Sequence, residues 1–155
     1  MAEILHGDRI GKTGTLKVGC AAVILSPQRD RVLLTRRTDN GLWCLPGGAM
    51  DAGESAAEAC CREVVEETGL VVEVTRLVGV YSSPHRVTRY ADGNTHQFVA
   101  LCFEAAVTGG ELGLSDETTE VGWFTSAEMA TMPIMSNHDE RIAHALQNRP
   151  DTIIA

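Results

Sequence analysis

Three glutamates in a short, otherwise apolar segment are the residues of this sequence best suited to chemistry. Glu63, Glu66 and Glu67 lie within five positions of the stretch 48–70, GAMDAGESAAEACCREVVEETGL. On a helix they would share one stripe, at spacings of three and four residues, where like charges destabilise the helix by about 0.2–0.5 kcal/mol per pair. Such a stripe is either a solvated acidic face or a set of oxygen ligands for a divalent cation such as Mg²⁺, which removes the repulsion. The spacing alone leaves both interpretations open.

The residues before this stripe favour the metal interpretation. Gly47 and Gly48, which follow Pro46, predict a tight loop whose backbone can approach an ion closely, because glycine has no Cβ. Counted from Gly48, the order is five residues, Glu, seven residues, Arg-Glu, Val, one residue, Glu-Glu, one residue and Gly-Leu. This order resembles the motif of the Nudix hydrolase family at every defined position. The flanking stretches VLLTRR, LPGG and EVGWF are also similar to that family, and the resemblance covers residues 18–130.

The resemblance implies an activity and a set of roles. Nudix hydrolases cleave a diphosphate that links a nucleoside to a second group, X, with the help of Mg²⁺ or Mn²⁺. The implied metal ligands, which are also catalytic, are Glu63, Glu66 and Glu67, with the Gly48 carbonyl as an additional ligand. The implied supporting residues are Arg62, which orients the glutamates, and Glu54 and Gly47, which brace the metal loop. A contact from Glu54 to a second metal is the alternative role for that side chain.

Two further segments supply candidate residues. Arg37 ends a predicted strand just before the glycine loop, and it is either a solvated charge at a strand end or, as the resemblance implies, a contact to substrate phosphate. Glu117 and Glu120 belong to the stretch 114–124, LSDETTEVGWF, which similar proteins often bring over the metals. We expect Glu117 to be the general base, with Glu120 as the alternative. A further metal ligand is the other role open to these two residues.

Substrate specificity is expected to depend on the polar loop 82–95. Pro84 lies at a distance after the motif that is typical of ADP-ribose hydrolases, and a simple turn proline is the alternative. Arg86 and Arg89 are expected to hold phosphate or ribose, and Tyr90 to stack on a base. The leading expectation is a nucleoside diphosphate linked to a sugar, such as ADP-ribose. The alternatives are a nucleoside triphosphate pyrophosphatase that cleans the nucleotide pool, and a non-catalytic Nudix-fold sensor of a nucleotide ligand.

Interleaved strand and helix patterns must position these residues. Strands are predicted at 17–26, 31–37, 71–81, 96–107 and 120–125, and the first two are expected to form a hairpin. Helices are predicted at 55–68, where Ser55 and Glu58 form a capping box and Gly69 is the stop, as a short turn after Thr125, and at 139–148. The pattern indicates an α/β (α+β) fold, in family terms a Nudix-type α/β/α sandwich with a mixed β-sheet between helices.

The first helix should pack on the sheet through an apolar stripe beside the acidic one. Its members are Ala57, Cys60, Cys61, Val64 and Thr68. His138, near the start of the last helix, is expected to cap that helix or to lie on the surface.

Composition limits the wider possibilities. A chain of 155 residues suits one domain, 1–155, with a core at about 18–148. The net charge of −8 argues against nucleic acid as a partner, and the apolar runs are too short for a membrane span. The five cysteines lack a paired spacing and the N-terminus lacks a secretory pattern, which favours reduced thiols in a cytoplasmic protein. We therefore expect a small nucleotide substrate as partner, and a monomer or a homodimer.

Overall fold

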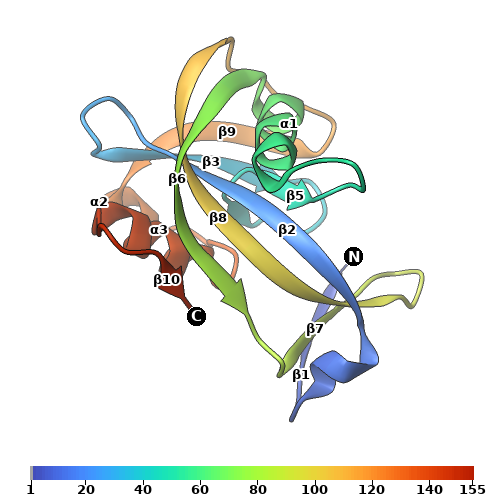
Figure 1. Cartoon of the computed structure of the whole chain (residues 1–155). Coiled ribbons are helices and arrows are strands. Elements are labelled where there is room, and N and C mark those ends of the chain that lie inside the picture. Colours follow the sequence, from blue (N-terminus) through green and yellow to red (C-terminus); the bar gives the residue numbers. More distant parts are fainter. Residues whose placement is uncertain (1) are drawn as a thin grey trace.

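Two β-sheets and three α-helices make up the part of the chain that the computed structural model describes, residues 2–155 (Figure 1). The strands are β1 Glu3–His6, β2 Thr15–Ile24, β3 Arg31–Arg37, β4 Trp43–Cys44, β5 Gly47–Ala49, β6 Leu70–Ser82, β7 Arg86–Arg89, β8 Thr95–Gly110, β9 Thr118–Thr125 and β10 Ile153–Ile154. The helices are α1 Ala56–Thr68, α2 Ser126–Met129 and α3 His138–Leu146, and a 3₁₀ turn covers Ile10–Thr13. No helix within 2–155 combines the length and the apolar character that crossing a membrane requires.

The larger sheet is mixed. Its strands follow the order β1-β7-β8-β2-β5, and β6 pairs with β8 and carries β10 at its edge. β2 runs parallel to β8 and β10 parallel to β6, whereas the other pairs are antiparallel. The smaller sheet is antiparallel and has the order β4-β3-β9. The mixed sheet that the sequence predicted is therefore confirmed, and a second sheet lies beside it.

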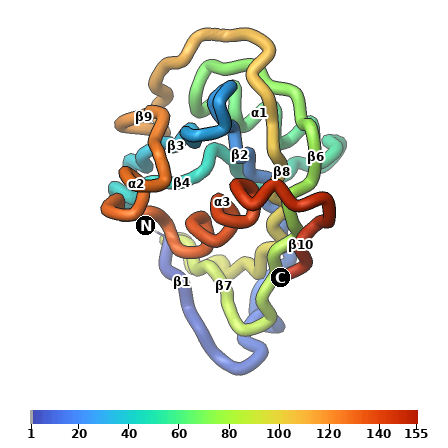
Figure 2. Tube along the Cα trace, turned by 90° about the vertical axis from the view of Figure 1, so that its left-hand side faces the viewer, coloured from blue at the N-terminus to red at the C-terminus, as the bar shows by residue number. Residues whose placement is uncertain are grey.

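Alternate residues of β2 point into two different cores. Cys20, Ala22 and Ile24 pack with α1, whereas Ala21 and Val23 belong to the cluster that contains residues of α3. This alternation is the period of two that a strand imposes on its side chains. The sheet consequently lies between α1 on one side and α3 on the other, as Figures 1 and 2 show. The predicted sandwich of helices around a mixed sheet is thus observed.

Helix α1 begins and ends where the sequence predicts. The Ser55 hydroxyl accepts a hydrogen bond from the backbone of Glu58, whose carboxylate in turn accepts one from the backbone of Ser55. Gly69 ends the helix in the left-handed conformation, with φ of 75°, which glycine adopts without strain. Val64 is fully buried, as expected. The buried face differs from the prediction, because Ala57 is exposed and Cys61 is only partly buried, whereas Ala59 and Glu67 are buried.

Two expectations about the strands are wrong. β2 and β3 do not form a hairpin, because β3 pairs with β4 and β9 in the smaller sheet. The two segments are joined beside the turn, by the bridge between Leu25 and Val32 and by a hydrogen bond from Ser26 N to the Arg31 carbonyl. The hydrophobic pattern marks each segment as a strand but does not specify its partner. The stretch 82–95 is also not all loop, since Arg86–Arg89 forms β7 and pairs with both β1 and β8.

Candidate active site

The glycine loop and helix α1 meet at two glutamates. Gly47 is part of β5, pairs with Ala21 of β2, and its backbone N–H donates a hydrogen bond of 3.0 Å to Glu67 Oε2. Gly48 lies against the carboxylate of Glu63, so closely that a Cβ at Gly48 would overlap both carboxylate oxygens. A Cβ at Gly47 would likewise overlap the backbone of β2. The absence of side chains at both positions therefore lets the loop pack directly on the acidic face of α1.

Arg62 connects the helix to the loop. Its Nε lies 2.5 Å and its Nη2 3.0 Å from the carboxylate oxygens of Glu54, and Nη2 also donates to the Ala49 carbonyl at 3.1 Å. Its Nη1 donates to Glu63 at 2.9 Å and to Glu66 at 3.2 Å. These contacts use the planar guanidinium as a fork between several acceptors. Hydrogen bonding to Arg62 lowers the pKa of Glu54 to about 2, so Glu54 stays ionised and holds the arginine in place.

The three glutamates differ in their surroundings. The Glu66 side chain is 57% exposed, whereas that of Glu63 is 13% exposed and residue Glu67 is 8% exposed. Within the described chain, no three His, Cys, Asp or Glu side chains are gathered closely enough to hold a metal ion. Arg62 lies between two of the predicted ligands, and Glu67 is held by the glycine loop. The proposed three-glutamate ligand set therefore stays a prediction.

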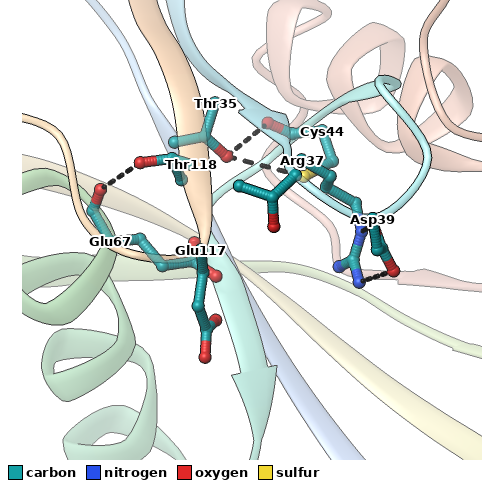
Figure 3. A pocket seen from close by; sticks show the side chains of 8 residues that line it. Thr35, Arg37, Asp39, Cys44, Glu67, Glu117 and Thr118 are labelled. Carbon is teal, nitrogen blue, oxygen red and sulfur yellow. Dashed lines mark hydrogen bonds and ion pairs between the residues drawn. The ribbon is translucent and has the colours of Figure 1, made fainter. Parts of the chain in front are cut away.

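A polar cavity of about 190 Å³ opens beside Glu67. Figure 3 shows Glu67 and Glu117 on one side of it and Arg37 with Asp39 on the other. The Nε and Nη2 of Arg37 each lie 2.8 Å from an oxygen of Asp39, so the two side chains form a two-pronged ion pair. The remaining lining residues come from β3, the β3–β4 turn, β4 and β9: they are Thr35, Thr38, Cys44 and Thr118.

Negative charge is concentrated where the cavity meets α1. Burial raises the pKa of Glu67 to about 7, and the charges of Glu63 and Glu117 act in the same direction, against the Gly47 N–H and Arg37. Burial also raises the pKa of Glu63, an effect that Arg62 opposes and that Glu66 and Glu117 reinforce. The donor atoms are carboxylate oxygens beside a glycine that leaves room for them. In their chemistry and charge these residues fit a hard divalent cation.

Of the two candidate bases, only Glu117 lines the cavity. Its neighbour on β9, Glu120, forms an ion pair with Arg36 at 2.6 Å on the exposed surface of the smaller sheet. The backbone of Glu117 is fixed by hydrogen bonds, since its carbonyl accepts from Thr38 N and its N–H donates to Ser115 Oγ. The geometry thus favours Glu117 for any role at this site.

The three candidates from the loop 82–95 do not form one surface. Arg89 forms an ion pair of 3.7 Å with Glu3 of β1. Because side chains alternate along a strand, Arg86 points to the other face of the sheet, where it is half-buried. Tyr90 packs edge-on against His96, with ring centroids 5.4 Å apart. Burial raises the pKa of Tyr90, and the charge of Arg37 opposes this effect. Tyr90 therefore contacts β8, whereas Arg89 faces β1.

Sequence reasoning missed two residues that matter here. Asp39 neutralises Arg37, and the signal was an acid two positions after an arginine in the turn RRTDNG. His138 is 9% exposed, and its Nδ1 accepts a hydrogen bond of 3.0 Å from Leu45 N, just before the glycine loop. The expectation that His138 caps a helix or lies on the surface is wrong, because Asn137 is the N-cap and His138 shares the buried face of α3 with Ile142.

Comparison with known proteins identifies the family. The model of the NUDIX domain matches residues 15–146, and the chain therefore belongs to the Nudix family. A MutT-like protein of Streptomyces ambofaciens is 39% identical over 73% of this chain and 66% of its own length. An ADP-ribose pyrophosphatase of Methanocaldococcus jannaschii is 37% identical over 73% of this chain and 63% of its own length. The match thus spans slightly less than two thirds of these relatives.

Another relative is named for a different substrate, and solved structures match this chain as well. A nucleoside triphosphatase of an Enterobacter species is 32% identical over 61% of this chain and 69% of its own length. The crystal structure of an ADP-ribose pyrophosphatase from Streptococcus suis superposes with a TM-score of 0.67 at 26% identity, over 89% of this chain and 96% of that one. These proteins share the fold and the family, whereas the substrates in their names differ.

Proposed function

We propose that this protein is a divalent-metal-dependent hydrolase that cleaves the diphosphate linkage of a nucleoside diphosphate joined to a second group. The observation that carries the proposal is the cavity in which Glu67 and Glu117 face Arg37, next to the acidic stripe of α1. Anionic oxygen ligands and a phosphate-binding arginine at one opening are what phosphoryl chemistry requires, because that chemistry depends on positioning and charge. The family membership supports the same reaction class.

Each side chain has a proposed task. Glu63, Glu66 and Glu67, with the Gly48 carbonyl, would hold Mg²⁺ or Mn²⁺. Bound there, the ion would neutralise the diphosphate and lower the pKa of a water molecule. Arg62 positions the glutamates through its contacts to Glu63 and Glu66, and Glu54 anchors Arg62.

On the substrate side, Arg37 would turn from Asp39 to a phosphate oxygen, and Glu117 would accept a proton from the attacking water. The proton acceptor and the phosphate contact thus lie across one cavity.

The leading substrate is a nucleotide sugar such as ADP-ribose. Three carboxylates, those of Asp39, Glu67 and Glu117, line the cavity together with the hydroxyls of Thr35 and Thr118. Such a lining accepts hydrogen bonds from sugar hydroxyls. The relatives named ADP-ribose pyrophosphatase support this choice. Cleavage of a nucleoside triphosphate is the second candidate, and the relative named nucleoside triphosphatase favours it.

The test is a comparison of kcat/KM for ADP-ribose, other nucleoside diphosphate sugars and the common dNTPs at fixed Mg²⁺, with products identified by mass spectrometry. ADP-ribose should give AMP and ribose 5-phosphate, and water labelled with ¹⁸O locates the attacked phosphorus. A preference for any dNTP by about tenfold, or about 1.4 kcal/mol in transition-state binding, would rule out the sugar assignment. Binding of ADP-ribose without turnover would instead identify a sensor.

A further inference from the structure

A buried arginine on α3 carries a charge that its surroundings do not neutralise. Arg141 is 7% exposed, and its Nε is buried without a hydrogen-bond partner. Among the ion pairs within residues 2–155, none involves Arg141. Burial removes the water that would otherwise solvate a guanidinium, and the loss is large unless another group replaces it. The positive charge of Arg141 therefore lacks a counter-charge.

The groups that contact Arg141 are neutral. Its guanidinium lies over the ring of Tyr81, 5.2 Å from the centroid, which provides a cation–π interaction but no counter-charge. The Tyr81 hydroxyl is hydrogen-bonded to His144 Nδ1 at 2.8 Å. Burial raises the pKa of Tyr81 and that of Cys102 to about 12, so both stay protonated at neutral pH. Neither Tyr81 nor Cys102 therefore places a negative charge near Arg141.

A second arginine faces the same side of the sheet as α3. The register places Thr88 opposite His96, and the face of β8 that carries His96 also carries Ala100 and Cys102, which pack with Ile142 of α3. Arg86, two residues before Thr88 on β7, therefore faces α3 as well. Arg86 is half-buried and also takes part in no ion pair of the described chain. Burial lowers the pKa of Arg141, and the charge of Arg86 acts in the same direction. Glu140 is the one acid whose charge acts on both arginines, and it is exposed and beyond ion-pair distance.

We propose that Arg141 and Arg86 bind a phosphate group on the α3 side of the larger sheet. A phosphate group carries about −1.5 to −2 charges at neutral pH, which matches two guanidinium groups better than a single carboxylate does. Its oxygens can accept from Nε and a terminal nitrogen of one arginine at the same time. The group could be free phosphate or the phosphoryl end of a nucleotide or sugar phosphate. Binding requires neither a metal nor turnover, so the site goes beyond the proposed hydrolysis.

The test measures thermal unfolding in EDTA while inorganic phosphate replaces chloride at constant ionic strength. Phosphate stabilises proteins generally, so the comparison is between variants. Arg141→Met keeps an apolar chain over Tyr81 and removes the charge, and Arg149→Met is the matched control, because Arg149 is exposed and paired with Asp151 at 2.8 Å. Phosphate should raise the Tm of the wild type and of Arg149→Met by several degrees more than that of Arg141→Met. An equal rise in all three overturns the proposal.

Further variants separate this site from its alternatives. Arg37→Met should keep the response to phosphate, and loss of the response in that variant would place the anion in the cavity instead. Arg141→Met should be at least as stable as the wild type without phosphate. If it is clearly less stable, and Glu140→Gln is destabilised equally, then Glu140 is the counter-ion and the proposal fails. Should Arg141→Met not fold, Arg86→Met carries the same comparison, since Arg86 is less buried.

Calorimetry in EDTA then identifies the source of the phosphate group. The probes are inorganic phosphate, AMP, ribose 5-phosphate and, as a neutral control, adenosine. Binding of AMP at least tenfold tighter than that of phosphate assigns the site to a nucleotide, and equal affinities assign it to free phosphate. Binding of all probes unchanged in Arg141→Met overturns the proposal. Because no hydrolysis is measured, these results are independent of whether the proposed enzymatic activity is found.

Discussion

Glu67 combines two properties that rarely occur in one carboxylate, since it is almost fully buried and yet receives only the Gly47 N–H as a short-range partner. Burial and the neighbouring Glu63 and Glu117 raise its pKa. Buried charge without a full set of partners costs free energy that a purely structural glutamate would avoid. The position is therefore best explained by a cation or a reacting group that is attracted to it.

Replacing Glu67 by Gln tests that explanation at the level of the side chain. The substitution keeps the shape and removes the negative charge, so turnover in Mg²⁺ should fall by about 100-fold or more, as for other losses of central electrostatic stabilisation. Glu73→Gln, an exposed glutamate on β6, is the control and should retain activity. Circular dichroism should show both variants folded. A Glu67→Gln protein with near-normal turnover would remove Glu67 from the proposed ligand set.

Gly48 offers a second test, in which no charge changes. A Cβ at this position would overlap the carboxylate of Glu63, whereas a Cβ at Gly113 would meet nothing within 4 Å. Gly48→Ala should displace Glu63 and reduce kcat by about 100-fold, the cost of a misplacement of about 1 Å at a reacting centre. Gly113→Ala should be indistinguishable from the wild type in the same assay. Equal activities would mean that the contact between the loop and Glu63 has no role in turnover.

Helix α1 shows which information at the level of elements is readable from sequence. The capping box of Ser55 and Glu58 and the stop at Gly69 depend on contacts within a few residues, and the helix was predicted correctly from them. Strand partners depend on residues far apart in the chain, which explains why the expected β2–β3 hairpin was wrong. The face of α1 was also only partly predicted, since Ala59 rather than Ala57 is buried.

Two adjacent valines of α1 allow a matched test of its packing. Val64 is fully buried against the sheet and Val65 is 44% exposed. Val64→Asp would bury an unpaired charge and should lower the free energy of unfolding by several kcal/mol. Val65→Asp should lower it by less than about 1 kcal/mol, mainly through an unfavourable charge near the helix C-terminus. Urea unfolding of both variants decides this, and similar losses would contradict the assigned packing of α1.

At the level of the whole molecule, α3 supports the glycine loop from the opposite side of the sheet. His138 accepts the hydrogen bond from Leu45 N, and Leu45 precedes Pro46 and the two glycines. The motif that the sequence makes obvious therefore depends on a histidine that lies about ninety positions later and gives no local signal of its contact. Likewise, Asp39 and Arg37 could be recognised as neighbouring residues of opposite charge, but their position across a cavity from Glu67 and Glu117 depends on how distant segments of the chain meet.

His138 makes the stability of the fold depend on pH. Burial lowers its pKa to about 3, with Arg141, Arg37 and Arg86 acting in the same direction. Below about pH 6.5 the unfolded chain binds a proton that the folded chain does not, so stability falls as the pH falls from 6.5 towards 3. His138→Asn places an amide oxygen near the position of Nδ1 but cannot titrate.

Urea unfolding at several pH values between 7.5 and 4.5 measures this effect. Between pH 7 and 5 the wild type should lose about 2 kcal/mol more than His138→Asn, as linkage predicts for a group that stays neutral on folding. His6→Asn, at an exposed position on β1, serves as control and should follow the wild type. Parallel curves for the wild type and His138→Asn would show that the folded protein accommodates the proton elsewhere.

The parallel pairing of β2 with β8 has a consequence for the order of events during synthesis. Thr15 pairs with His96 and Ile24 with Ala105, so until the chain beyond residue 95 has been made the first long strand has only the short strand β5 as a partner. β3 has only the short strand β4 as a partner until β9 has been made, because Arg31 pairs with Thr125. Distant pairing of this kind slows folding and leaves strand edges open in the meantime. Nascent chains stalled on the ribosome with residues 1–94 exposed should be digested readily by protease, and those with the full chain exposed should resist. Early protection would show that a different, local arrangement forms first.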